Sequence, residues 1–167
     1  MHYLEKEFER LIKYTQGLGV KVSFVDDASI DMSAAWTTDG SEIEIFNRKC
    51  KGPLLLCLEI IHELAHHLTW VHNGRGGDLN TNRILAKEMA GKTLTKKQRK
   101  VIFDMEAYDS QFQKIIHKEI NSKIPIKRLE REIALDLWIY EYFYKKGVWP
   151  KIKDRKQKIK ELRKIYV

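Results

Sequence analysis

Two histidines and a glutamate in one short run have the spacing of a metal site. The run is His62-Glu63-Leu64-Ala65-His66. On a helix, residues four apart lie on the same face, so both imidazoles can reach one zinc ion. Glu63 would lie about 100° round the helix, close enough to take a proton from a zinc-bound water without binding the metal itself. Because zinc lowers the pKa of its water towards about 7, the pattern predicts metal-assisted hydrolysis with Glu63 as the base.

The residues around this run argue against a coincidence. Ile60, Ile61 and Leu68 make the predicted helix apolar nearly all round, which indicates that it is buried. Three buried ionisable side chains without a metal would be costly. We therefore expect a zinc site. His67 faces elsewhere, and we expect it at the surface or supporting the site.

A zinc site needs a third protein ligand, and three side chains are candidates. His72 lies six residues after His66, as in the pattern His-Glu-x-x-His-x-x-Gly-x-x-His, but Thr69 stands where that pattern has its glycine turn. Glu106, on a later predicted helix, would complete the His-His-Glu set of many hydrolytic zinc sites. Glu106 is our preferred ligand, and His72 and Glu132 remain alternatives.

Hydrolysis also needs a donor for the negative charge that develops on the carbonyl oxygen. Tyr108, His117 and Tyr140 are the candidates in this chain. The sequence does not select among them.

The apolar periodicity of the preceding sequence predicts the elements before the metal-binding run. Helical spacing predicts a first helix over residues 4–15, and alternation predicts a strand from Val20 to Phe24. Residues 34–46 form a predicted hairpin around the turn pair Asp39-Gly40. Pro53 then opens the helix that carries the two histidines.

The elements after the run are predicted to be helical. Thr95 and Gln98 form a capping box for a helix that ends near Ile120, and a further helix ends near Gly147. Pro150 separates this helix from a basic tail helix. The predicted fold class is therefore mainly helical α+β, with a small antiparallel sheet before the active-site helix. We expect one domain over residues 1–149 and a basic tail over residues 150–167.

Length and composition exclude several other classes. A chain of 167 residues with 43% hydrophobic and 32% charged residues has the length and composition of one globular domain. Its longest apolar run, Leu54 to Leu58, is far shorter than the roughly 20 residues of a membrane helix. The start of the chain resembles no secretory signal, so we expect a cytoplasmic protein with no membrane partner and free thiols at Cys50 and Cys57.

The net charge of +8 is concentrated near the end of the chain. The chain has 31 basic and 23 acidic residues, and residues 145–167 contain ten of the basic and two of the acidic ones. The part before residue 145 therefore has 21 residues of each sign. Such a tail can bind nucleic acid, bind an acidic partner or remain solvated.

Two stretches resemble the zincin metallopeptidases of the ImmA/IrrE type and the small phage and mobile-element metallopeptidases similar to them. The stretches are Ile61-His62-Glu63-Leu64-Ala65-His66-His67-Leu68 and Asp104-Met105-Glu106-Ala107-Tyr108, and with the hairpin the resemblance covers about residues 1–120. The resemblance implies a compact zincin fold and an enzyme that cleaves a protein or peptide substrate. His62, His66 and Glu106 would be the zinc ligands and Glu63 the catalytic base.

The resemblance carries two further implications. Ile43 to Phe46 would be an edge strand that holds an extended peptide by β-addition. Related enzymes place an aspartate four residues after the ligand glutamate to orient a histidine, but this chain has Ser110 there and Asp109 one residue earlier.

Two alternative functions use the basic tail. In the first, the chain is a catalytically weak zincin scaffold that binds nucleic acid. In the second, it is a DNA-activated protease similar to SprT.

Overall fold

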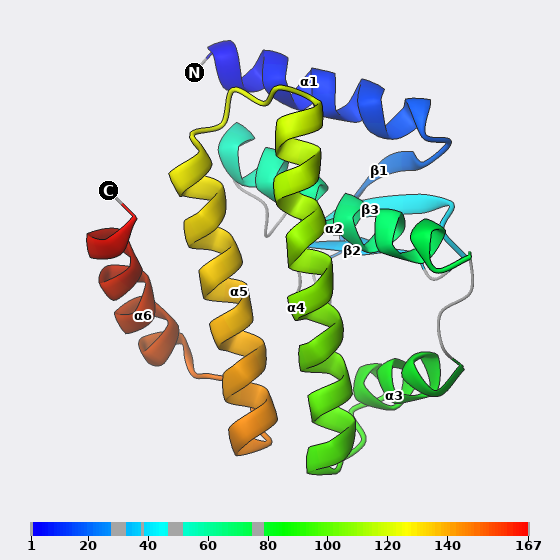
Figure 1. The fold of residues 1–167 in the computed structure, drawn as a ribbon, viewed down its shortest axis with the longest axis vertical. Helices are drawn as coiled ribbons and strands as arrows, with labels where there is room; N and C mark the ends of the chain where they lie inside the picture. The colour runs from blue at the N-terminus through cyan, green and yellow to red at the C-terminus, as the bar shows by residue number, and fades with distance from the viewer. Residues whose placement is uncertain (1, 28–32, 38, 47–51, 75–78, 167) are drawn as a thin grey trace. The chain divides into compact units, whose positions relative to one another are not determined.

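The computed structural model describes residues 2–27, 33–37, 39–46, 52–74 and 79–166. Along the chain, the described residues form six helices and three strands (Figure 1). These are α1 (His2–Gly17), β1 (Lys21–Val25), β2 (Ala34–Trp36), β3 (Glu42–Phe46), α2 (Pro53–His72), α3 (Leu79–Met89), α4 (Lys96–Glu119), α5 (Ile126–Lys146) and α6 (Ile152–Ile165). The predicted mainly helical α+β class is confirmed.

The chain divides into two compact units, neither of which is continuous in sequence. The first consists of Met1–Arg75 and Gln111–Pro125, and the second of Gly76–Ser110 and Ile126–Val167. Helix α4 contributes to both and is one uninterrupted helix through the boundary. Helix α6 is part of the second unit. That residues 150–167 act as a separate tail stays a prediction.

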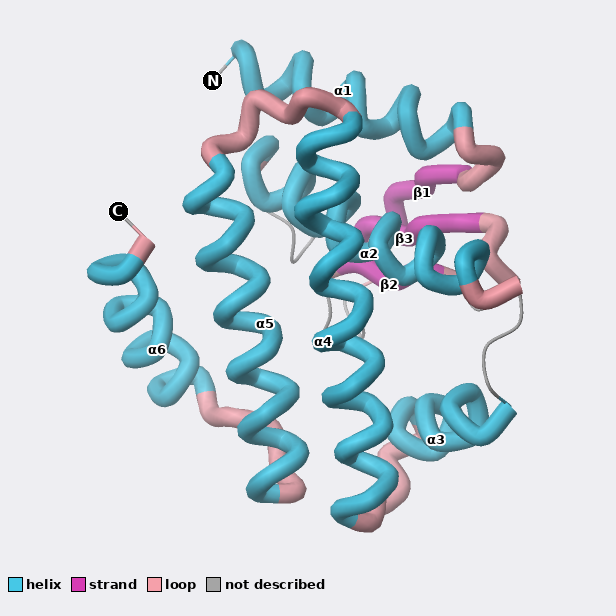
Figure 2. Tube along the Cα trace, viewed as in Figure 1, coloured by secondary structure: helices cyan, strands magenta, loops and turns pink. Residues whose placement is uncertain are grey.

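The sheet of the first unit has the order β1-β3-β2 (Figure 2). Strands β2 and β3 form the predicted antiparallel hairpin, whereas β1 pairs with β3 in parallel, so the sheet is mixed. Strand β3 lies in the middle and is paired on both sides. The expectation that Ile43 to Phe46 forms an edge strand is therefore wrong, because no hydrogen-bonding edge of β3 is open to a peptide.

The turn of the hairpin is held by its own side chains. Asp39 Oδ1 accepts hydrogen bonds from Thr37 Oγ1 at 2.8 Å and from the Ser41 backbone N–H at 3.0 Å. Gly40 has a φ of 76°, which a residue with a Cβ rarely adopts. A Cβ at Gly40 would also lie 2.5 Å from the Trp70 ring on α2. The turn is thus packed against the helix that carries the histidines.

Helix α2 is the central element of the first unit and packs against α1 and strands β2 and β3. Ile60, Ile61 and Leu64 are fully buried, as is the free thiol of Cys57, while Cys50 lies outside the described residues. By length and composition alone, α2 is the one described helix able to cross a membrane. Half of its most apolar stretch is buried within the protein, which is typical of a core helix and makes this weak evidence for a membrane span.

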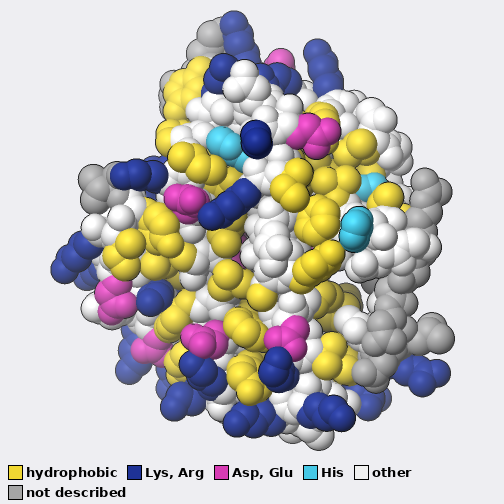
Figure 3. Space-filling model, in the orientation of Figure 1, with side chains coloured by type: hydrophobic (Ala, Val, Ile, Leu, Met, Phe, Trp, Pro, Cys, Tyr) yellow, Lys and Arg dark blue, Asp and Glu magenta, His cyan; other side chains and the backbone are white. Residues whose placement is uncertain are grey.

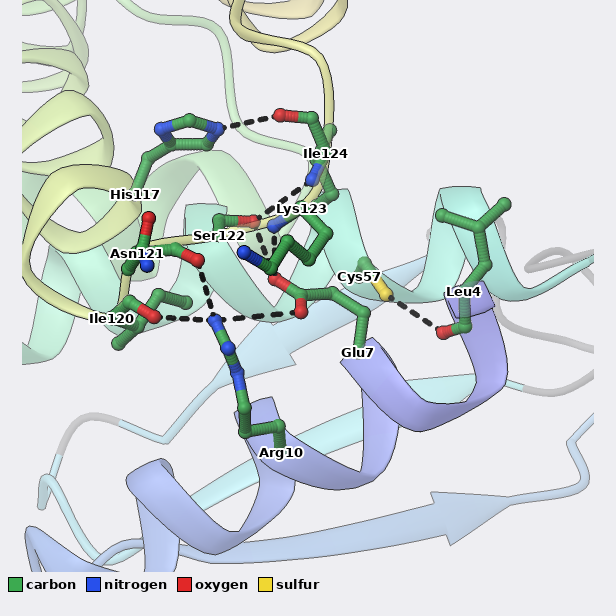
Figure 4. A network of polar contacts seen from close by, with 10 residues as sticks. All are labelled: Leu4, Glu7, Arg10, Cys57, His117, Ile120, Asn121, Ser122, Lys123 and Ile124. Atoms are coloured by element: carbon green, nitrogen blue, oxygen red, sulfur yellow. Dashed lines mark hydrogen bonds and ion pairs between the residues drawn. The ribbon is translucent and has the colours of Figure 1, made fainter. Parts of the chain in front are cut away.

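A polar network around the buried Glu7 joins α1 to the turn after α4 within the first unit (Figure 4). The Glu7 carboxylate accepts hydrogen bonds from Ser122 Oγ at 2.5 Å and from the Lys123 backbone N–H at 3.0 Å. Arg10, which lies on α1 like Glu7, donates to the carbonyls of Ile120 and Asn121. These bonds fix the C-terminal end of α4 on the unit that contains α2.

The second unit has its own small core. Ile84 of α3, Ile102 of α4 and Phe143 of α5 are buried together with Leu94. The Trp149 ring stacks on Phe143, with centroids 4.1 Å apart and planes 5° apart. Four segments of this unit therefore meet around one apolar cluster.

Candidate metal centre

The two histidines of α2 point at one place in space. Their Nε2 atoms lie 3.2 Å apart, with the rings at 84° to each other. Two nitrogens that bind one tetrahedral zinc at 2.0–2.1 Å are separated by about 3.3 Å. The spacing of His62 and His66 therefore fits a pair of zinc ligands.

Glu106 completes a group of three ligands. One donor atom each from His62, His66 and Glu106 can be chosen so that all lie within 4.8 Å of one another. Glu106 is buried and is carried by α4. Two imidazole nitrogens and one carboxylate oxygen are a donor set that zinc accepts in hydrolytic sites.

Neither alternative third ligand belongs to this group. The His72 ring packs against Phe112, with centroids 6.0 Å apart. Glu132 forms an ion pair with Arg131 at 2.7 Å. Of the three predicted candidates, the structure brings only Glu106 to the two histidines.

Gln113 contacts the first histidine from α4. Its side chain is buried, and Nε2 lies 3.1 Å from His62 Nδ1. The oxygen and nitrogen of an amide exchange places by a half-turn of the group, so the same side chain can present its oxygen to an Nδ1–H. That arrangement leaves the lone pair of Nε2 for a metal.

Gln113 was not predicted from the sequence. At the position where the resemblance places an orienting aspartate the chain has Ser110, whose hydroxyl donates to the Ala107 carbonyl at 2.9 Å. Gln113 stands seven residues, or two helical turns, after Glu106 and hence on the same face of α4. That spacing was the available signal.

The backbone of β2 presents a donor towards α2. The Thr37 N–H donates to the Glu42 carbonyl, and the Phe46 N–H donates to the Ser33 carbonyl. Because successive N–H groups of a strand point to opposite sides, these bonds place the Trp36 N–H on the side of β2 away from β3. This outer edge faces Glu63.

Glu63 is fixed by that donor. Its Oε2 accepts a hydrogen bond from the Trp36 N–H at 2.8 Å, and the carboxyl is buried. Burial raises the pKa of Glu63, while the charge of His66 and the Trp36 hydrogen bond act in the opposite direction. A carboxylate held in this way, beside two imidazoles, is placed to exchange protons.

Burial, together with the charge of His66, lowers the pKa of His62 to about 3. His62 is therefore neutral at pH 7. A neutral imidazole is the form that binds metal ions.

His67 lies elsewhere on α2 from the ligand pair. It is buried, where a surface position was one expectation, and its ring lies 6.4 Å from the Trp36 ring and 5.8 Å from the Trp70 ring. It therefore packs against the residue whose N–H holds Glu63.

The three predicted donors for a carbonyl oxygen have different surroundings. His117 Nε2 lies 2.7 Å from the Ile124 carbonyl in the network of Figure 4. The Tyr140 ring packs edge-on against Trp149 in the second unit. Tyr108 is exposed on α4, two residues after Glu106. The structure assigns the role to none of them.

Comparisons of this chain with protein-family models, with curated proteins and with solved structures found no match.

Proposed function

We propose that the chain is a zinc-dependent metallopeptidase that hydrolyses peptide bonds in a protein or peptide substrate. The observation that carries the proposal is the convergence of His62 Nε2, His66 Nε2 and a Glu106 oxygen beside a buried Glu63. The resemblance to the ImmA/IrrE type is part of the proposal. So is a cytoplasmic location, which the free thiol of Cys57 favours.

Each side chain has one role in the proposed reaction. His62, His66 and Glu106 would hold zinc, which when bound supplies a water of lowered pKa and polarises the carbonyl. Glu63 takes a proton from the water as the water oxygen attacks the carbonyl carbon. It then gives this proton to the amine as the carbon–nitrogen bond breaks. The Trp36 N–H keeps one carboxylate oxygen in place and leaves the other to carry the proton.

The test separates metal binding from catalysis. Mass spectrometry of the purified chain should find about one zinc in the wild type and in Glu63→Gln, none in His66→Ala and less in Glu106→Gln. Cleavage of a mixed peptide library should fall about 10²–10⁴-fold in Glu63→Gln, the range for loss of a general base. Glu59→Gln, one turn earlier on α2, is the matched control and should keep both zinc and activity.

Two results would overturn the proposal. The first is a wild-type chain that holds no zinc after reconstitution. The second is a Glu63→Gln variant that cleaves as fast as the wild type.

A further inference from the structure

The positive charge of the chain belongs to one unit. The first unit contains 11 Lys and Arg against 12 Asp and Glu, so its net charge is −1. The second contains the other 20 basic residues and the other 11 acidic residues, so its net charge is +9. The net positive charge of the second unit is therefore larger than that of the whole chain. This charge is not confined to the last helix.

One face of α6 carries a row of lysines. Lys153, Lys156, Lys160 and Lys164 are spaced by three, four and four residues, which places them along one side of the helix. All four are exposed, and none takes part in an ion pair with the described residues. The row spans roughly 16 Å at 1.5 Å per residue, a length that holds about five phosphates of one nucleic acid strand.

Further lysines lie where the start of α4 meets the end of α5. Arg99 joins these two ends, because Nη1 donates to the Leu94 carbonyl at 2.6 Å and Nε donates to the Tyr144 carbonyl at 3.2 Å. Lys97 and Lys146 are exposed at this junction. Figure 3 shows Lys and Arg side chains along the lower edge of the view, where these helix ends lie in Figure 1. We call the four lysines of the α6 row the basic surface.

The packing of α6 argues against a membrane as the partner. The middle of its apolar stripe is turned towards the protein, since Leu162 is buried and Ile159 is partly buried. Lys158 lies over the Trp138 ring of α5, 6.0 Å from the centroid. A helix that lies in a bilayer interface needs a broad free apolar face, whereas the exposed isoleucines of α6, Ile152 and Ile165, lie at its two ends, 13 residues apart.

We propose that the basic surface binds the phosphate backbone of nucleic acid. A row of exposed, unpaired lysines at regular spacing complements a regularly charged polyanion, and each contact releases a counterion. The proposal is independent of peptidase activity, because every residue of the basic surface lies outside the candidate metal centre.

The test compares two variants of equal charge in the full-length chain. One carries Lys→Gln at residues 153, 156, 160 and 164. The control carries Lys→Gln at residues 6, 13, 118 and 123, which are exposed lysines of the first unit. Binding of a labelled 20-nucleotide strand is followed by fluorescence anisotropy over a range of salt concentrations.

The α6 variant should bind about tenfold or more weakly, and the slope of log K against log salt should fall by about 3. The control should retain the wild-type slope. Glu63→Gln should bind the strand like the wild type, so a failed peptidase assay leaves this result unaffected.

Three outcomes would overturn the proposal. They are an equal loss of binding in both lysine variants, no binding of the strand by the wild type, and wild-type binding to phosphatidylserine vesicles but not to the strand.

Discussion

A histidine binds a metal through Nε2 only when its ring hydrogen is on Nδ1, so the group beside Nδ1 determines how well it binds. For His62 that group is the buried amide of Gln113, at 3.1 Å. Since an amide oxygen is neutral, it orients the ring without adding a second negative charge beside Glu106.

We predict that Gln113→Leu weakens zinc binding by about 10–100-fold, the usual cost of losing a group that orients a ligand. Competition with a chromophoric chelator measures the change. Gln113→Glu should restore binding, because a carboxylate also accepts from Nδ1–H. Gln111→Leu changes an exposed glutamine of the same helix and should have no effect. Wild-type zinc affinity in Gln113→Leu would contradict this role.

The residues of the site differ in how far the sequence predicts them. Spacing alone brings His62 and His66 together, because one helix carries both. Glu106 had to be chosen among three side chains by chemistry, since nothing local indicates which later helix contacts α2. The Trp36 donor could not be predicted, because a backbone N–H has no residue signature and its direction depends on the strand register.

At the scale of elements, the hairpin turn connects strand geometry to the site. The Trp70 ring lies against Gly40 and 5.8 Å from the Trp36 ring, so the turn, α2 and the residue that holds Glu63 pack as one group. A substitution in the hairpin turn therefore alters the packing beside the Glu63 carboxylate.

Gly40→Ala should lower the free energy of unfolding by about 2–4 kcal/mol. About 1–2 kcal/mol comes from the left-handed backbone, and the rest comes from overlap with the Trp70 ring. Gly19→Ala is the matched control, because Gly19 has a φ of 82° and no atom within 4 Å of the added Cβ. Urea unfolding followed by circular dichroism measures both variants. Equal losses in the two would show that the contact with Trp70 contributes nothing.

Elements with strong local signals were predicted, and those without them were not. The turn pair Asp39-Gly40 and the alternation of Ile43 and Ile45 were sufficient for the hairpin. The parallel pairing of β1 with β3 was not predicted, because no local pattern specifies a partner that follows an intervening strand. Helix α3 received no assignment, since its stretch of asparagines and threonine is a poor helix former and buries mainly Ile84.

At the scale of the whole molecule, zinc should couple to stability. The proposed ligands come from two helices far apart in sequence, so the unfolded chain lacks the site and zinc binds only the folded state. Zinc at 100 times its dissociation constant then stabilises the fold by about 2.7 kcal/mol. For a chain of this size we expect a rise in Tm of about 5–10 °C.

Differential scanning calorimetry with zinc and with EDTA tests this coupling. The wild type should show the shift, and EDTA should reverse it. His66→Ala should show no shift. A shift of the same size in His66→Ala would mean that zinc stabilises the chain at some other place.

The passage of α4 through both units determines the order in which the protein can be built during translation. The first unit lacks residues 111–125 until long after its first 75 residues have been synthesised, and the second unit is divided by that same segment. His62 and Glu63 thus leave the ribosome many residues before Glu106 and Gln113. During synthesis the apolar helix α2 is therefore complete before the segment of α4 that belongs to its unit has been made. Because both units are discontinuous in sequence, no contiguous fragment of the gene encodes either unit alone.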